Sequence, residues 1–207
     1  MQVNFKDAQR SFGAQMVFDK LDYRFLESSR TAVLGGNGSG KSTLLKCLYG
    51  ALSLSKGDLI YQLEGRDITA AEAVGRISFS GPYFELIEEL EAQEFLETYQ
   101  RFRNLMLPAK EILHHSYLEK SATKKIKQFS SGMKQRLRLS LAIFSESDLV
   151  ILDEPIANLD PKGIDWYQET LQNNLGKRSL VIGSNFSKDE TFFCQDELKV
   201  VDFAPLD

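Results

Sequence analysis

The eight residues Gly35–Ser42 constrain the fold of this chain more than any other stretch. They read GGNGSGKS and match the pattern G-x-x-x-x-G-K-[ST] at every fixed position. The apolar, β-branched run Thr31–Leu34 predicts a buried strand before them, and TLLKCL predicts a helix after them that ends at Gly50. Glycines let consecutive N–H groups converge on phosphate oxygens, Lys41 can reach the β- and γ-phosphates, and the Ser42 hydroxyl can ligate Mg²⁺. The pattern predicts a strand, loop and helix that bind nucleotide phosphates.

A second helix start, about ninety residues later, also has the composition of a phosphate site. In FSSGMKQRL, Phe129–Leu137, the residues Ser130, Ser131 and Gly132 lead into a basic helix with an apolar stripe. The first turn of such a helix has free N–H groups and a partial positive charge. Because Gly35–Ser42 already form a complete phosphate cradle, this start predicts a second, separate phosphate contact.

Two acids, Asp153 and Glu154, follow the apolar run Leu149–Leu152, which is typical of a buried parallel strand. Ligands bind at the carboxyl ends of strands in open α/β sheets. Asp153 can hold Mg²⁺ and its waters, and Glu154 can take a proton from an attacking water. Taken alone, two acids that merely cap a strand explain the pattern equally well. A phosphate loop in the same chain favours the chemical interpretation.

Residues 83–145 differ in character from both flanks and predict a helical lobe inserted into an α/β domain. ELIEELEAQEFLE carries six glutamates and neither lysine nor arginine. An apolar stripe at helical spacing behind it is expected to pack in a core: Phe95, Tyr99, Phe102 and Met106. Pro108 is expected to separate this helix from the next. That next helix carries His114 and His115, which are expected to face solvent rather than a metal.

The composition is that of a soluble globular protein and disfavours several other classes. Hydrophobic residues make up 43% of the 207 residues, and the net charge of −4 has the wrong sign for binding nucleic acid by charge, so no nucleic-acid partner is expected. Cys47 and Cys194 lack zinc or disulfide spacing and predict reduced cytosolic thiols. The N-terminus has no signal-peptide pattern, and no apolar run approaches the roughly 20 residues of a membrane span. We therefore expect another chain to supply any spans.

These motifs together resemble the nucleotide-binding subunit of ABC (ATP-binding cassette) transporters over nearly the whole chain. Gly35–Ser42 matches the Walker A loop, Leu149–Glu154 the Walker B strand with its catalytic glutamate, and Phe129–Met133 the LSGGQ signature. Ala157–Asp160 matches the D-loop, and Phe12 falls where the family stacks an aromatic ring on adenine. The resemblance implies a P-loop ATPase core with a parallel sheet, an antiparallel β subdomain near the N-terminus and an inserted helical lobe. It divides a single domain, 1–207, into the core with the β subdomain (1–82 and 146–207) and the lobe (83–145).

The resemblance also implies that two chains pack head to tail, with each ATP between the phosphate loop of one chain and the SSG helix of the other. The residues expected to bind ATP are Phe12, Gly35, Gly36, Asn37, Gly38, Ser39, Gly40, Lys41, Ser42, Thr43, Ser130, Ser131 and Gly132. The residues expected to act in catalysis are Glu154, Lys41 and Asn185, and those expected to hold Mg²⁺ are Ser42 and Asp153. The implied partners are a second copy or a homologous ATPase subunit and a separate transmembrane permease chain.

Four positions depart from the family pattern. Ser131 stands for a glycine and Met133 for a glutamine in the signature, and both changes are mild. Gly81 falls at the glutamine of the Q-loop and has no side chain to touch metal or water. Asn185 falls at the switch histidine; its amide can donate a hydrogen bond to a γ-phosphate but cannot carry charge. ATP binding is therefore predicted more firmly than fast hydrolysis.

The sequence leaves three interpretations open. The leading one is an ATPase that powers a membrane transporter made of separate chains, cytoplasmic and peripheral on the inner face of the membrane through its permease. Gly81 and Asn185 motivate a second one, an ATP-gated dimerisation switch with little turnover. A third is a soluble ABC ATPase that serves a process other than transport. The transported substrate cannot be derived from these residues, because the permease determines it.

Overall fold

The computed structural model describes residues 1–204 and contains two sheets. The antiparallel sheet has the order β2-β1-β4-β5, and the parallel sheet has the order β6-β7-β8-β3-β9. The first sheet consists of β1 (Gln2–Phe12), β2 (Gln15–Phe25), β4 (Lys56–Leu63) and β5 (Arg66–Ile68). The second consists of β3 (Arg30–Leu34), β6 (Ile77–Ser80), β7 (Leu149–Asp153), β8 (Ser179–Ser184) and β9 (Asp196–Lys199).

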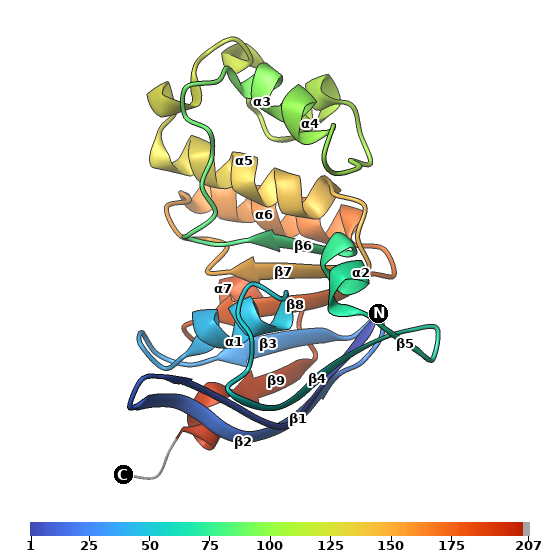
Figure 1. Ribbon diagram of the computed structural model, residues 1–207. Coiled ribbons are helices and arrows are strands. Elements are labelled where there is room, and N and C mark those ends of the chain that lie inside the picture. The colour runs from blue at the N-terminus through green and yellow to red at the C-terminus, as the bar shows by residue number, and fades with distance from the viewer. Residues whose placement is uncertain (205–207) are drawn as a thin grey trace.

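The helices cover the parallel sheet and build the lobe above it (Figure 1). They are α1 (Lys41–Leu48), α2 (Ala70–Gly75), α3 (Ala92–Tyr99), α4 (Ala109–His115), α5 (Ser131–Phe144), α6 (Pro161–Asn174) and α7 (Lys188–Thr191). Short 3₁₀ turns occur at Glu119–Ser121, Ile126–Gln128 and Val200–Phe203. The predicted α/β fold, with a parallel sheet, an antiparallel β subdomain and an inserted helical lobe, is confirmed. Within residues 1–204, no helix is both long and apolar enough to span a bilayer.

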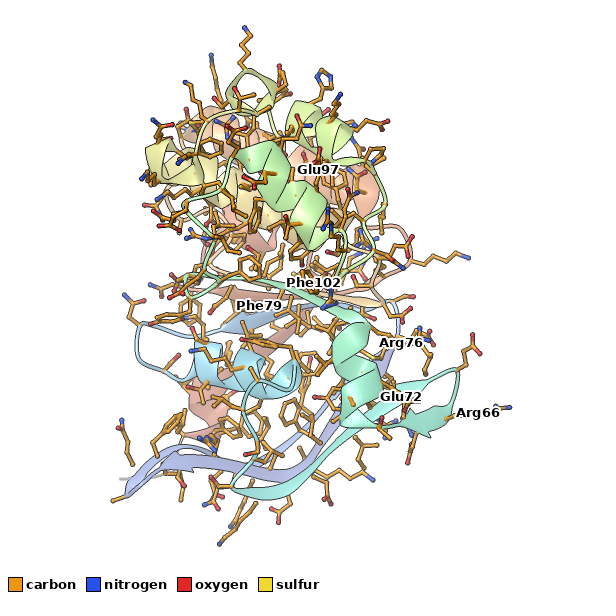
Figure 2. The ribbon with its side chains drawn as sticks, turned by 45° about the horizontal axis from the view of Figure 1, so that its top comes forward. Arg66, Glu72, Arg76, Phe79, Glu97 and Phe102 are labelled. Atoms are coloured by element: carbon orange, nitrogen blue, oxygen red, sulfur yellow. The ribbon has the colours of Figure 1, made fainter. Side chains whose placement is uncertain are left out.

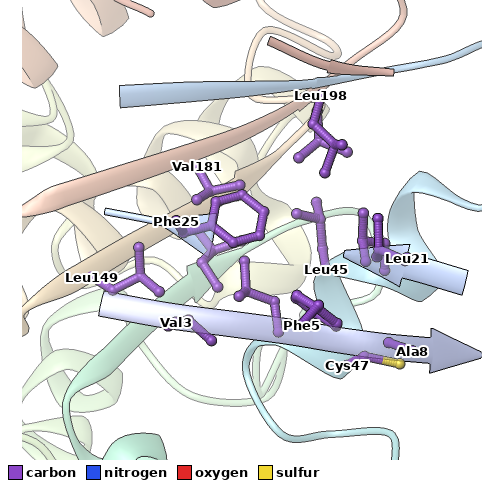
Figure 3. Close-up of a cluster of buried hydrophobic side chains, with 14 of the residues drawn as sticks. Val3, Phe5, Ala8, Leu21, Phe25, Leu45, Cys47, Leu149, Val181 and Leu198 are labelled. Atoms are coloured by element: carbon purple, nitrogen blue, oxygen red, sulfur yellow. The ribbon is translucent and has the colours of Figure 1, made fainter. Parts of the chain in front are cut away.

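Three apolar clusters hold these layers together. The largest lies between the two sheets and encloses α1; Figure 3 shows its side chains arriving from β1, β2, α1 and the parallel strands. Cys47 of α1 is completely buried in it. A second cluster packs α5 and α6 against the other face of β7 and β8. The third lies wholly between Leu86 and Phe144 and forms the core of the lobe.

The lobe corrects one prediction about its first helix. α3 ends at Tyr99, not near Met106, and the Phe102 side chain is 83% exposed. The chain closes with i→i+3 hydrogen bonds from the Phe102 N–H to the Tyr99 carbonyl and from the Arg101 N–H to the Thr98 carbonyl. This tight turn rotates later side chains off the helix face. The apolar spacing in the sequence therefore continues past Tyr99, although the helix α3 ends there. His114 and His115 are exposed, as predicted.

Candidate functional site

A cavity of about 490 Å³ opens at the carboxyl ends of β3 and β7. Its lining combines the predicted phosphate loop with residues from the β1–β2 hairpin and from the segments after β6 and β7. The lining residues are Phe12, Gln15, Val17, Gly36, Asn37, Gly38, Ser39, Gly40, Lys41, Ser42, Thr43, Pro82, Tyr83 and Glu154. Most of the residues expected to meet ATP within one chain are therefore brought together.

The phosphate loop has the backbone that its glycines predict. Gly38 and Gly40 adopt positive φ angles of 79° and 97°, a region that other residues enter at a cost. A Cβ on Gly40 would lie 2.4 Å from Cγ1 of Val17, so the loop rests directly on β2. Gly40 is also the N-cap of α1, whose first turn carries no acidic residue. The free N–H groups of this turn and the helix dipole therefore favour an anion.

Lys41 extends along the loop rather than into solvent. Its Nζ donates hydrogen bonds to the carbonyls of Gly35 at 2.7 Å and Gly36 at 3.2 Å, and it lies 4.0 Å from Oε1 of Glu154. The side chain is only 4% exposed. An ammonium held in this way places a fixed positive charge beside the anion-binding turn and faces the carboxylate of Glu154.

Asp153 ends β7 with a carboxylate whose hydrogen-bonding capacity is not filled. Its Oδ1 is buried and has no hydrogen-bond partner among residues 1–204. A Cβ on Gly183 would lie 2.5 Å from that oxygen, and a Cβ on Gly81 would lie 3.0 Å from the Cβ of Asp153. Gly183 on β8 therefore makes room for this carboxylate, and Gly81, directly after β6, makes room for the Cβ of the same residue.

Burial raises the pKa of Asp153 above its usual range, while a hydrogen bond from the Ser42 hydroxyl lowers it and the nearby Glu154 raises it. A buried carboxylate with a free oxygen, bonded to a hydroxyl at the foot of a phosphate loop, is a fitting donor set for a hard divalent cation. Ser42 and Asp153 are the residues that can hold Mg²⁺ here. Its positive charge would also favour the ionised carboxylate.

Glu154 turns sharply out of the sheet immediately after Asp153. Its φ angle is +50°, and its N–H donates to the Gly183 carbonyl at 2.9 Å. A non-glycine residue in this region is held there by its surroundings, and such strain is common where a side chain must be aimed. Here the turn directs a partly exposed carboxylate into the cavity, towards Lys41.

Phe12 and Gln15 line the opposite end of the cavity, at the tip of the β1–β2 hairpin. They are paired across a two-residue turn in which Gly13 has φ +57°. The Phe12 ring is 48% exposed. An exposed ring beside a phosphate loop is well placed to stack on a base.

The SSG helix start lies outside this cavity. Ser130 is the N-cap of α5 and accepts a hydrogen bond from the Met133 N–H at 3.2 Å, as a helix start requires. Ser131 begins the helix, and a Cβ on Gly132 would lie 3.1 Å from the Asn158 carbonyl. Figure 1 shows α5 in the upper part of the molecule and α1 in the lower part, with β6 and β7 between them. Within one chain, Ser130–Gly132 therefore do not share the cavity with Lys41.

Asn185 follows the end of β8, is exposed and does not line the cavity.

Sequence reasoning missed several residues that build the site. Gln15, Val17, Pro82 and Tyr83 line the cavity, and Gly183 shapes the space around Asp153. A glycine inside the apolar strand LVIGS was the available signal for Gly183, because such a glycine marks the close approach of another group. The others carry no pattern of their own.

The fold and the site define a P-loop nucleotide-binding protein of the cassette type. The model of the family described as "ABC transporter" matches residues 18–157, and the chain belongs to this family. It is 31% identical over 202 residues to the daunorubicin resistance ATP-binding protein DrrA3 of Streptomyces coeruleorubidus, covering 94% of this chain and 63% of that protein.

It is also 28% identical over 206 residues to the Nod factor export ATP-binding protein I of Burkholderia lata, covering 97% of this chain and 67% of that protein. The chain thus spans about two thirds of the length of these relatives. Among solved structures, the ATP-binding cassette MJ0796, a dimer in a post-hydrolysis state with ADP and Pi, superposes with a TM-score of 0.81 at 22% identity. That alignment covers 95% of this chain and 93% of the cassette.

Proposed function

We propose that this chain binds and hydrolyses ATP as the energising subunit of a membrane exporter whose spans belong to a separate chain. One observation carries the proposal: Glu154 faces Lys41 of the phosphate loop in a single cavity, and the adjacent Asp153 accepts a hydrogen bond from the Ser42 hydroxyl of that loop. The names of the two relatives, which refer to drug resistance and to export, support the direction of transport. We also propose that residues 1–207 act as a single cassette domain with the lobe at 83–145.

Each residue contributes a separate part of the reaction. Phe12 stacks on the base, the N–H groups of Gly36–Ser42 and the Lys41 ammonium bind the phosphates, and Thr43 extends that turn. Ser42 and Asp153 would hold Mg²⁺, which would supply positive charge beside the phosphates when bound. Glu154 accepts the proton of the attacking water. Its partly exposed carboxylate lies 4.0 Å from the ammonium that binds the phosphates, close enough to contact a water beside them.

A second copy of the chain, or a homologous subunit, completes the site. The helix start at Ser130–Gly132 has free N–H groups and a positive dipole end, but it lies outside the cavity of its own chain. Head-to-tail packing brings it to the γ-phosphate of the partner, and loss of that phosphate loosens the pair. The dimeric cassette with the same fold supports this arrangement.

The permease is proposed to dock beside α3, at an apolar groove of about 340 Å³ that shares Tyr83 with the nucleotide cavity. The groove is lined by Tyr49, Val74, Ile77, Phe79, Tyr83, Phe84, Tyr99 and Arg103. Figure 2 shows Phe79 and Phe102 between α2 and α3 in this view, with the acidic α3 residue Glu97 above them. Aromatic surface beside six glutamates fits an apolar segment that carries basic residues. This docking would place the chain on the inner face of the membrane.

A second function, an ATP-gated dimerisation switch with little turnover, has its own support. Gly81 supplies no side chain beside Asp153, and Asn185 lies outside the cavity. In that case the chain dimerises with ATP but releases phosphate very slowly.

One set of measurements tests these proposals. Titration calorimetry should show that Lys41→Ala loses most Mg-ATP affinity, whereas Lys110→Ala, an exposed change on α4, should bind as wild type does. Turnover per chain should rise with protein concentration as dimers form. Near-wild-type ATP binding by Lys41→Ala would overturn the phosphate-loop assignment. Turnover per chain that stays constant down to the monomer range would overturn the shared site, and ATP-dependent dimers without phosphate release would favour the switch.

Docking is tested by recovery of the membrane chain in detergent extracts. Val74→Asp, a change at a groove residue that is 40% exposed, should reduce the recovery of a multispanning membrane chain. Tyr117→Asp, on the lobe and 64% exposed, lies outside the groove and should not. Equal recovery with both variants would place the permease elsewhere.

A further inference from the structure

Arg10 lies two residues before Phe12 on β1, and its side chain covers the ring that faces the nucleotide cavity. Residues i and i+2 of a strand point to the same face. The guanidinium carbon of Arg10 is 4.4 Å from the centroid of the Phe12 ring, which is the distance of a cation–π contact. One face of this exposed ring is therefore occupied by a residue of the same strand.

The Arg10 side chain is held at this place by more than the ring. Its Nη1 donates a hydrogen bond of 2.9 Å to the Ser53 carbonyl, in the loop after α1. Next to it, the Ser11 N–H donates to Oγ of Ser55 at 3.0 Å. The Nε of Arg10 is buried and has no partner within the described part of the chain, 1–204. The ring is thus the group against which the rest of the guanidinium packs.

We propose that Arg10 is a positioning residue for the nucleotide base, which rests on the proposed ATP binding. An aromatic ring offers two faces to a planar partner. With one face taken by the guanidinium, the base stacks on the other, and the ring is held in one orientation before the nucleotide arrives. Arg10, Phe12 and the base then form a three-layer stack, and the cation strengthens binding through the ring without touching the phosphates.

The expected effect is small but selective. A partly exposed cation–π contact is worth about a two- to fivefold change in an equilibrium constant. Arg10→Ala should therefore weaken ATP binding by about two- to fivefold. It should leave the binding of tripolyphosphate unchanged, because this anion has the phosphates but no base. Arg24→Ala, an exposed change on β2, is the matched control and should alter neither.

A double-mutant cycle separates positioning from a general structural role. Calorimetry with Mg-ATP and with Mg-tripolyphosphate is carried out on wild type, Arg10→Ala, Phe12→Ala and the double variant. We expect Arg10→Ala to have no further effect on ATP binding once Phe12 is alanine. A loss of similar size for both ligands, or the same loss in the Phe12→Ala background, would overturn the positioning role.

The two ligands also distinguish this proposal from the proposed function. If wild type binds ATP no more tightly than tripolyphosphate, base stacking is absent and the role of Arg10 is refuted, while the phosphate site stands. If wild type binds neither, both proposals fail. Selective loss of ATP affinity, dependent on Phe12, supports the stack.

Discussion

Glu190 is a buried acid near the site, and its removal gives a sharp test of how the site is held together. It lies on α7, is 5% exposed, and its Oε2 accepts a hydrogen bond from the Ser184 hydroxyl. Its carboxylate also accepts one from the Ile156 N–H. Ser184 in turn accepts from the Ser187 N–H at 3.0 Å. The carboxylate therefore ties the turn that contains Glu154 to the loop that contains Asn185.

Glu190→Ala leaves two donors, the buried Ser184 hydroxyl and the N–H of the half-buried Ile156, without their acceptor. Each buried donor left unsatisfied costs about 1–3 kcal/mol, and relief of the buried carboxylate offsets part of this sum, so we expect a loss of about 2–4 kcal/mol. For a domain of this size the loss corresponds to a fall in Tm of about 4–16 °C. Glu190→Gln should lose less stability than Glu190→Ala, because its amide oxygen can still accept a hydrogen bond from one of the two donors.

The assay is thermal and urea unfolding of the three proteins, with phosphate release measured alongside. Glu169→Ala, an exposed glutamate on α6, is the control and should lie within about 0.5 kcal/mol of wild type. We expect Glu190→Ala also to lower kcat more than it weakens ATP binding, since the Glu154 turn loses its anchor. If Glu190→Ala melts like wild type, the network does not stabilise the fold. If Glu190→Gln falls as far as alanine, charge and not the bonding pattern explains the stability.

Three further predictions concern the chemistry of the site. Glu154→Gln should lose about 10²–10⁴ in kcat and accumulate as an ATP-bound dimer in size exclusion; normal hydrolysis would exclude Glu154 as the base. Asn185→His should raise the rate of phosphate release with unchanged ATP affinity, whereas a silent change would limit Asn185 to a structural role. Burial raises the pKa of Glu190, so the folded state binds its proton more tightly than the unfolded state. Wild type should therefore lose stability relative to Glu190→Gln as pH rises from about 4.5 through that raised pKa, and a difference independent of pH would contradict this.

The parts of the site that the sequence predicted are those formed by consecutive residues. Gly35–Ser42 folds as its pattern requires, because the glycine conformations and the start of α1 are local properties of that stretch. Leu149–Asp153 forms the buried strand that its apolar run predicts, and α5 begins after Ser130. In each case the residues that determine the local backbone conformation are also the residues predicted to bind phosphate or metal.

The apolar spacing of the sequence predicted the wrong environment for Phe102, because it did not predict where α3 ends. Phe102 continues the helical spacing of Phe95 and Tyr99 but is 83% exposed, because the chain turns after Tyr99. An apolar period predicts which face a residue would occupy if the helix continued, but it cannot predict where hydrogen bonding ends the helix.

The sequence by itself therefore determined the α/β class, the phosphate loop and the acids beside it, since each depends on neighbours along the chain. Only the tertiary structure decided what surrounds them. Gly81 and Gly183 make room for Asp153 because β6, β7 and β8 lie side by side in one register, although they are far apart in the sequence. Arg10 covers Phe12 because a hairpin from the other sheet reaches the phosphate loop. Contacts of this kind depend on how strands align and how layers pack. A single residue that belongs to no repeating sequence pattern does not indicate which distant residue it will contact.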